Sequence, residues 1–284
     1  MKLISSIAMP AWVAGLKVIT SRCESCHKSL ALRHLSARKA GIRMHGNWYC
    51  SSRCFQSATE QEVLRLLKPG SEQAARVERM PLGLSLIGHG FLTMEQLKKA
   101  TDEQKEVGGD LGELLVRQGL VSEKQVTAVR ATEWGCPVFA VPKHAFRIGI
   151  DLPSTLMRIY SMIPVHYVVR TNLLLVGFVN SIEYGLLYAT EQITGCETKP
   201  CFVTPSDFQM QMQQQEKEPA QPGSTPAREL TFESIQTPAE IAQTLCASGI
   251  EIEADEAFIE RCREYLWARL KSETQAVDLL FRTG

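Results

Sequence analysis

The chain contains 284 residues, with 31 basic and 31 acidic side chains that leave no net formal charge. This balance argues against a global electrostatic attraction to nucleic acid or to a membrane surface. The hydrophobic content of 44% is ample for ordinary globular cores, and the length favours two or three domains. The sequence has no run of about 18 apolar residues, so it predicts no membrane-spanning helix.

Residues 1–20 are mildly apolar and precede the first motif. Pro10 and Trp12 interrupt the apolar run, and a cysteine cluster follows directly, which argues against a secretory signal peptide. We interpret this segment as a loosely ordered leader, or as the result of a start codon placed too far upstream.

Two close cysteine pairs follow the leader. Pairs at this separation can supply four thiolates to one tetrahedral zinc ion. Zn²⁺ is therefore the predicted cofactor, and the predicted ligands are Cys23, Cys26, Cys50 and Cys54. The remaining cysteines are expected to be small buried residues in a reducing compartment, and they are Cys136, Cys196, Cys201, Cys246 and Cys262.

Region 21–70 is predicted to be a zinc finger followed by a helix at 57–67. Short strands are expected at 41–44 and 47–49, and the second cysteine pair lies where a strand runs into a helix, an order that resembles a treble-clef finger. A module this small cannot bury enough apolar surface alone, so zinc should supply its folding energy. His27 as a substitute ligand and a redox-active Cys-x-x-Cys are the alternatives, but four cysteines already complete a metal site.

The finger region is also basic, and Trp48 and Tyr49 lie within it. This composition is compatible with contact to RNA or DNA, although a solvated basic surface explains it as well and no nucleic-acid-binding fingerprint is present. The basic residues are Lys17, Arg22, Lys28, Arg33, Arg38, Lys39, Arg43 and Arg53.

Residues 81–133 contain the same pattern twice, at one constant offset. Each copy predicts a short apolar helix, a left-handed glycine stop, and a second helix that begins at a capping box. The stops are Gly90 and Gly119, and the capping boxes are Thr93-x-x-Gln96 and Ser122-x-x-Gln125.

After the repeats the pattern becomes mixed. A helix is predicted at 153–160 with Leu156 and Ile159 facing inward, and then a hairpin of two strands at 163–169 and 173–179.

A helix at 181–194 should end at Gly195, followed by a strand at 201–203 and a polar helix at 205–214. Asn180 and Glu183 could face a ligand, but capping of the helix is the simpler role for Asn180 or Ser181.

The doubled Leu-Gly…Gly-Leu-Val-Ser-Glu-x-Gln pattern resembles the N-terminal, MshEN-like domain of the type II secretion and type IV pilus assembly ATPases. The resemblance continues through 163–168, 172–180 and 193–203, in the family's order. It implies that region 78–214 folds as this domain, and that the domain docks on other components of a pilus or secretion machinery. The implied parts are helical repeats at 81–133 and an α/β part at 134–214.

Some members of that family bind cyclic di-GMP through an Arg-Leu-Gly at the head of each repeat. This chain has Pro81 and Asp110 at the two arginine positions. An aspartate repels a phosphate, and no arginine remains at these positions to pair with one. The two substitutions argue against a cyclic dinucleotide ligand.

Residues 215–228 have the composition of a linker. The C-terminal unit at 229–284 is predicted to be of ββαα type, with a strand at 230–232 paired to a last strand at 277–281. Its first helix should begin at Thr237-Pro238-Ala-Glu240 and be broken by Gly249. Its second helix is predicted over 254–270, from a stripe formed by Phe258, Ile259, Cys262, Tyr265, Leu266 and Leu270.

The sequence thus predicts an α+β, multidomain protein. It contains no GxxxxGK[ST] phosphate loop and no GxSxG, HExxH or GxGxxG motif, so no catalytic residues are predicted. The leading hypothesis is a non-enzymatic cytoplasmic adaptor that docks on protein partners. A cyclic dinucleotide sensor and a zinc-dependent nucleic-acid binder are the alternatives.

Overall fold

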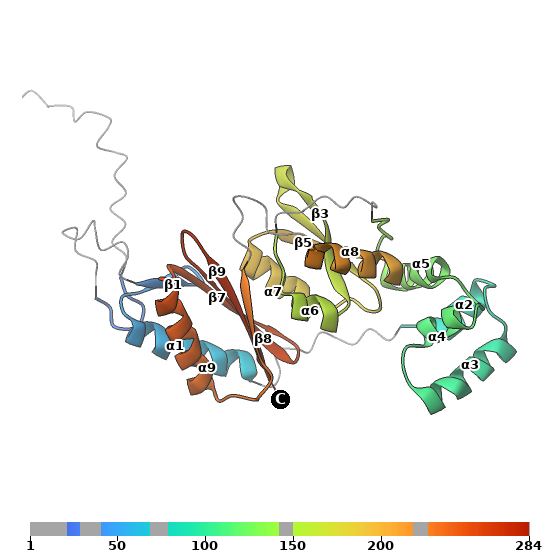
Figure 1. Cartoon of the computed structure of the whole chain (residues 1–284), viewed down its shortest axis with the longest axis horizontal. Helices are drawn as coiled ribbons and strands as arrows, with labels where there is room; N and C mark the ends of the chain where they lie inside the picture. The colour runs from blue at the N-terminus through green and yellow to red at the C-terminus, as the bar shows by residue number, and fades with distance from the viewer. Residues whose placement is uncertain (1–21, 29–40, 69–78, 142–149, 218–226, 284) are drawn as a thin grey trace, which may run out of the picture.

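The computed structural model describes residues 22–28, 41–68, 79–141, 150–217 and 227–283, and it confirms the α+β class (Figure 1). The predictions for the leader 1–20, for most of the linker 215–228, and for Lys17, Arg33, Arg38 and Lys39 lie outside these residues. Within them, no helix is long and apolar enough to cross a bilayer.

Two sheets organise the described residues. The larger sheet has the strand order β2-β1-β7-β8-β9-β6, and the smaller has the order β3-β4-β5. The larger contains β1 (Ile42–Met44), β2 (Asn47–Tyr49), β6 (Arg228–Phe232), β7 (Glu256–Cys262), β8 (Tyr265–Lys271) and β9 (Ala276–Arg282). The smaller contains β3 (Met162–Val168), β4 (Leu173–Phe178) and β5 (Glu197–Phe202).

The helices fall into three groups along the chain. Those packed on the larger sheet are α1 (Ser52–Leu67) and α9 (Pro238–Glu251). Those of the repeats are α2 (Leu82–Gly88), α3 (Met94–Val107), α4 (Leu111–Arg117) and α5 (Glu123–Trp134). Those around the smaller sheet are α6 (Ser154–Ile159), α7 (Tyr184–Thr194) and α8 (Pro205–Lys217), with a 3-10 turn, η3 (Val169–Thr171), between β3 and β4.

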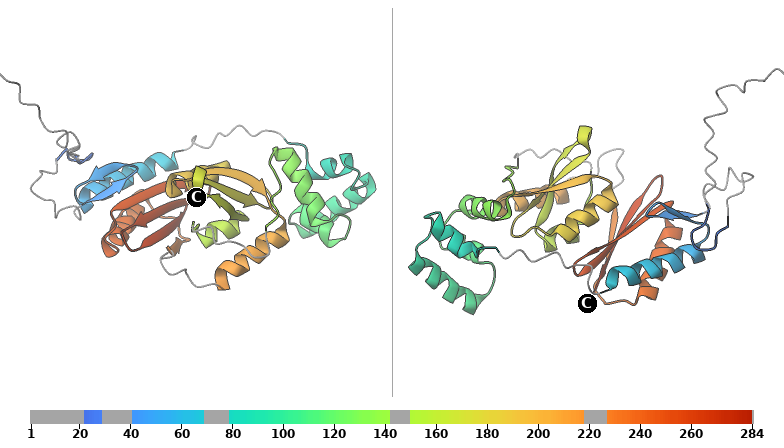
Figure 2. Two further views of the ribbon diagram at one scale, coloured as in Figure 1. Left: turned by 90° about the horizontal axis from the view of Figure 1, so that it is seen from above. Right: turned by 180° about the vertical axis from the view of Figure 1, so that it is seen from behind.

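The larger sheet unites the two ends of the chain. Strand β1 pairs in parallel with β7, and the Arg43 amide donates to the Asp255 carbonyl at 2.9 Å. Helix α1 lies against α9, as the views in Figures 1 and 2 show, and one buried cluster contains Phe55 and Val63 together with Leu245. The segments predicted as a finger and as a C-terminal unit therefore share one sheet and one core.

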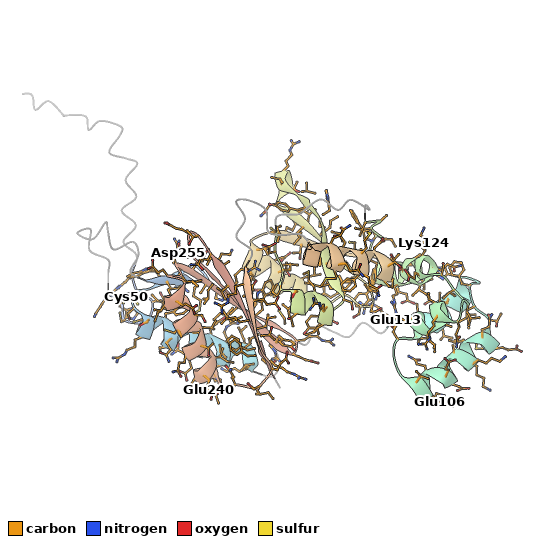
Figure 3. All side chains as sticks on the ribbon, viewed as in Figure 1. Cys50, Glu106, Glu113, Lys124, Glu240 and Asp255 are labelled. Atoms are coloured by element: carbon orange, nitrogen blue, oxygen red, sulfur yellow. The ribbon has the colours of Figure 1, made fainter. Side chains whose placement is uncertain are left out.

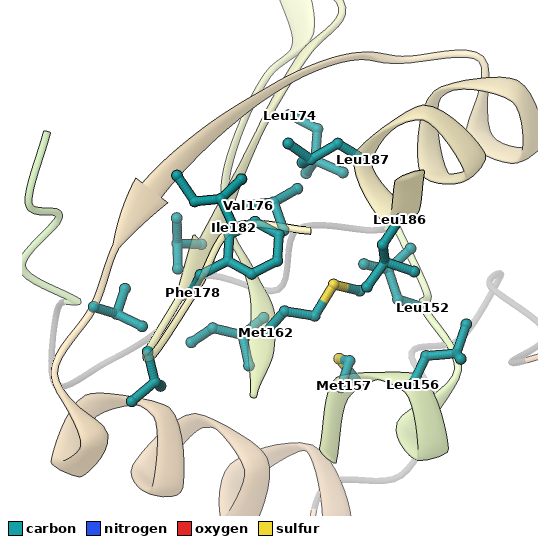
Figure 4. Close-up of a cluster of buried hydrophobic side chains, with 14 of the residues drawn as sticks. Leu152, Leu156, Met157, Met162, Leu174, Val176, Phe178, Ile182, Leu186 and Leu187 are labelled. Atoms are coloured by element: carbon teal, nitrogen blue, oxygen red, sulfur yellow. The ribbon is translucent and has the colours of Figure 1, made fainter. Parts of the chain in front are cut away.

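The larger sheet also packs on the α/β part. The buried cluster of the smaller sheet, drawn in Figure 4, continues into the larger sheet through Tyr265, Trp267 and Leu280. Polar contacts join the same parts: the Tyr160 hydroxyl donates to the Cys262 carbonyl at 2.8 Å. Because both faces of the larger sheet are covered, its central strands are buried on both sides.

The repeats fold as their local signals predict. Gly90 and Gly119 have φ values of 73° and 69°, which a residue without a Cβ adopts at little cost. Thr93 and Ser122 each form a complete capping box with the glutamine three residues later. The paired helical hairpins are therefore confirmed.

The second helix predicted for the C-terminal unit is wrong. Residues 256–271 form the antiparallel strands β7 and β8, joined at Arg263, whose φ is 51°. A sheet covered on both faces shows no clean alternation of apolar and polar residues, so its buried positions also matched a helical stripe. The unit is βαβββ in order rather than ββαα, while the predicted pairing of 230–232 with 277–281 is confirmed as parallel.

Two smaller expectations are also corrected. Gly249 does not break a helix but lies buried within α9, where a Cβ would approach the Ile42 Cδ1 to 3.3 Å. Glycine thus allows close packing of β1 on α9. Ile159 is 46% exposed rather than inward-facing, whereas Leu156 is fully buried.

A group of titratable residues lies where α1 meets β7. Glu260 of β7 is 6% exposed, and burial, together with the charge of Glu62, raises its pKa to about 7 despite nearby Arg65. The His45 Nε2 lies 4.0 Å from the Glu62 Oε1, and burial lowers the pKa of His45. The contact between the two ends of the chain therefore includes a carboxyl group that resists ionisation.

We predict that Glu260→Gln stabilises the protein at pH 8 but not at pH 4.5. At low pH Glu260 is protonated in the folded and the unfolded chain, so its burial has no ionisation cost. Above the unfolded pKa of about 4.3 the folded state loses stability as the pH rises, until the folded pKa of about 7 is passed. The gain at pH 8 should be on the order of 1–3 kcal/mol in denaturant unfolding. Exposed Glu264→Gln, in the β7–β8 turn, is the control and should show no such pH-dependent gain. Equal effects of the two variants at both pH values would contradict the prediction.

Candidate functional site: the cysteine cluster and the repeat junction

The structure brings the four predicted metal ligands together. Cys23 and Cys26 lie on a turn, Cys50 directly follows β2, and Cys54 lies in the first turn of α1. The Ser51 hydroxyl caps α1 by accepting from the Cys54 amide at 3.3 Å, which fixes the start of the helix beside the cluster.

The sulfur positions suit a tetrahedral metal ion. All four Sγ atoms lie within 4.8 Å of one another, with 3.4 Å between Cys26 and Cys50 and 3.9 Å between Cys50 and Cys54. Zinc–sulfur bonds of about 2.3 Å place tetrahedral sulfurs about 3.8 Å apart. These four cysteines could therefore hold a metal ion after only small side-chain adjustments.

The electrostatics of the cluster also favour a cation. Burial opposes ionisation of Cys23, yet the amides of Cys26, Cys50 and Ser25 outweigh it and lower the pKa of the Cys23 thiol to about 6. For Cys50, burial and the surrounding sulfurs raise the pKa to about 12. Four thiols this close cannot all ionise unless a positive charge compensates them, and metal binding releases their protons.

Two other predictions for this region concern His27 as a metal ligand and the basic residues as a nucleic-acid contact. His27 is exposed and does not belong to the sulfur cluster, so the structure gives no support to its role as a ligand. Arg22, Lys28, Arg43 and Arg53 are the predicted basic residues that the structure describes. The other predicted basic residues lie outside the described ranges, so contact with nucleic acid stays a prediction.

The second candidate site lies at the head of the second repeat. Asp110 is the N-cap of α4 and accepts from the Glu113 amide at 3.0 Å. Both of its carboxylate oxygens also accept from the Arg130 Nη2, each at 2.8 Å. From the sequence, Asp110 was expected only to repel a phosphate. In the structure it caps a helix and acts as the counter-ion of Arg130.

Arg130 connects the repeats to the smaller sheet. Its Nη1 donates to the Asn180 side-chain oxygen at 2.6 Å and to the Val179 carbonyl at 3.1 Å, and its side chain is 8% exposed. The sequence reasoning did not identify this residue. The sequence did contain a signal for its role. Arg130 lies one helical turn after buried Val126, on the face of α5 that points to the core.

The predicted cap roles of Asn180 and Ser181 are wrong. Helix α7 has Glu183 as its N-cap residue, and no side chain caps it. Asn180 instead accepts from Arg130, and Glu183 pairs with Arg263 of the larger sheet at 3.1 Å. Both residues therefore stabilise contacts between parts of the chain.

The two candidate sites lie far apart. Figure 3 shows Cys50 at one end of the molecule, beyond the larger sheet, and Glu113 and Lys124 of the repeats toward the other end. A ligand at one site therefore does not contact the other.

Comparisons with known proteins point to one group of relatives. No protein-family model matches the chain. The type IV pilus assembly ATPase PilB of Thermus thermophilus is 30% identical over 129 residues, which are 45% of this chain and 14% of PilB. The chain thus spans a small part of the length of this relative. The expected sequence similarity to the pilus assembly ATPases is confirmed.

Solved structures give matches of limited overlap. The structure of MshE with cdg is 20% identical with a TM-score of 0.38, and the match covers 48% of this chain and 99% of that chain. The N-terminal domain of XpsE is 19% identical with a TM-score of 0.37, covering 46% of this chain and 91% of that chain. None of the three comparisons indicates the cysteine cluster, which rests on the residues of this chain alone.

We predict that Asp110→Ala destabilises the protein strongly. The substitution removes a helix cap and leaves the buried Arg130 guanidinium without its carboxylate, which should cost about 3–5 kcal/mol of unfolding free energy in denaturant titrations. The exposed Asp102, paired with Lys105, provides the control Asp102→Ala, which should cost less than about 1 kcal/mol.

A double variant separates the two causes. Asp110→Ala combined with Arg130→Met removes the unpaired charge and should recover part of the loss. A single Asp110→Ala variant as stable as its control would show that Arg130 does not depend on Asp110.

Proposed function

We propose that this chain is a non-enzymatic, zinc-binding adaptor in the bacterial cytoplasm. In this proposal, residues 78–214 form a domain like the N-terminal domain of type II secretion and type IV pilus ATPases, and this domain docks on protein components of such a machinery. The comparisons match part of a pilus ATPase, and the sequence contains no phosphate loop. The proposal therefore assigns these residues a docking role.

The observation that carries the proposal is the ion pair between Asp110 and Arg130, at the junction of the repeats and the smaller sheet. Asp110 occupies a position where cyclic di-GMP-binding relatives are expected to have arginine, and it engages Arg130 with both oxygens. An incoming phosphate would meet this carboxylate, and the Arg130 guanidinium already has protein partners on both of its terminal nitrogens. This arrangement favours a constant protein-binding surface over a dinucleotide-sensing pocket.

Zinc is the metal that the cluster should select. Four thiolates in tetrahedral reach are typical of a closed structural zinc site, which has no open position for substrate. Under the proposal, Cys23, Cys26, Cys50 and Cys54 hold the ion, and its role is to stabilise the fold.

We expect the purified chain to contain one zinc per molecule by elemental analysis. Cys26→Ser should lower the zinc content and the affinity for zinc, because it removes one thiolate ligand from an exposed position. Cys136→Ser removes a cysteine outside the cluster and should retain full zinc content. Equal zinc content in the two variants would reject the assigned ligand set.

The proposed docking role predicts that the chain binds protein components of a pilus or secretion machinery. Full-length chain used as bait in native lysate should recover pilus or secretion components that mass spectrometry can name. Asp110→Ala should reduce recovery severalfold by loosening the repeats from the sheet, whereas Asp102→Ala should not. Failure to recover any such component, or tight calorimetric binding of cyclic di-GMP, would count against the proposal.

A further inference from the structure

The segment 41–68, here called the N-terminal latch, contains β1, β2 and α1. The latch contacts the C-terminal part of the chain through strand β1 and helix α1. Strand β1 pairs with β7 over only two registered positions, Arg43 with Glu256 and Met44 with Ala257. A strand contact this short is weak alone, so the placement of β1 depends on the rest of the latch.

Helix α1 provides the second contact of the latch. It shares a buried cluster with α9, in which Ile241 and Leu245 of α9 are at most 1% exposed. Polar contacts accompany this packing: the Cys246 Sγ lies 3.6 Å from the Ser52 carbonyl oxygen, and Arg261 donates to the Leu66 carbonyl at 3.2 Å. Both ends of α1 are therefore fixed to the C-terminal part.

The cysteine cluster lies between these two contacts. Cys50 follows the hairpin β1–β2, and Cys54 lies in the first turn of α1, so a shared metal ion would fix the angle between hairpin and helix. The turn that carries Cys23 and Cys26 is joined to the same hairpin, since the Glu24 amide donates to the Trp48 carbonyl at 3.1 Å. The angle so fixed is the one at which β1 pairs with β7 while α1 packs on α9.

We propose that metal binding by the cysteine cluster determines whether the N-terminal latch completes the larger sheet. With metal bound, the sheet has six strands. Without metal, the hairpin and α1 lose their relative orientation, and the latch leaves β7 and α9. The inference rests on the metal binding proposed above and adds a consequence for the opposite end of the chain.

The expected change is local. Strand β7 remains paired with β8 over seven positions from Glu256 to Cys262, and β8 remains paired with β9. The other face of the sheet remains packed on the α/β part through Tyr265, Trp267 and Leu280. Metal loss should therefore uncover the β1-facing edge of β7 and the α1-facing side of α9, and should leave the four remaining strands and the repeats folded.

Hydrogen exchange followed by mass spectrometry tests this on the full chain. Zinc-loaded protein is compared with the same protein after chelation, and zinc content is measured on both samples. We expect exchange to rise at least about tenfold in segments 41–67 and 238–257, which corresponds to ~1.4 kcal/mol of lost protection. Segments 111–134 and 173–202 belong to other cores and should not change.

Two variants repeat the comparison without a chelator. Cys26→Ser should reproduce the exchange pattern of chelated protein, and Cys136→Ser should match the zinc-loaded protein. Chelation of the wild-type chain keeps the test decisive even where Cys26→Ser does not fold.

The possible outcomes distinguish this inference from the proposed function. Absence of zinc from the wild-type chain would remove the metal site itself. Bound zinc whose removal changes exchange only at 22–28 and 47–54 would leave the site intact but reject the latch. Loss of protection throughout the chain, including 173–202, would also reject it, because the inference requires a local release.

Discussion

The parallel contact between β1 and β7 is the constraint that sets the topology of the larger sheet. This contact places N-terminal and C-terminal strands in one sheet. The chain between β1 and β7 therefore forms the long connection that two parallel strands require. The repeats and the α/β part, residues 79–217, are consequently an insertion within one folding unit. They are not a connection between two separate units. The sheet is then covered by α1 and α9 on one face and by the α/β part on the other.

Local features could be predicted from the sequence because the interactions that form them join near neighbours. The Thr93 and Ser122 capping boxes connect residues three positions apart, and Gly195 ends α7 in the left-handed region with a φ of 72°. The cysteine cluster was predictable for a related reason. Each pair consists of two cysteines close together in the sequence, and two such pairs are typical of a zinc site. The β1–β2 hairpin precedes Cys50 directly, and the Cys50 Sγ lies 3.4 Å from the Cys26 Sγ.

The remaining features depend on partners that are distant in sequence. Strands β7 and β8 resembled a helix because the sheet is buried on both faces, and Trp267, Ala268 and Arg269 are consecutive buried residues. No local pattern indicates that β1 pairs with β7. Arg130 was missed because its role depends on Asp110 in the preceding helix and on Asn180 in the other half of the domain.

The contacts of the same arginine limit what an anion could gain by binding at this junction. A ligand shifts a conformational equilibrium only by binding one state better than another. Arg130 already has a tethered carboxylate and two neutral acceptors, and a tethered group competes with a free anion at high effective concentration. An anion would therefore gain little by displacing Asp110 and would leave this half-buried carboxylate without its arginine partner. The junction between repeats and sheet is thus held by the chain itself, which suits a docking surface whose geometry does not depend on a bound nucleotide.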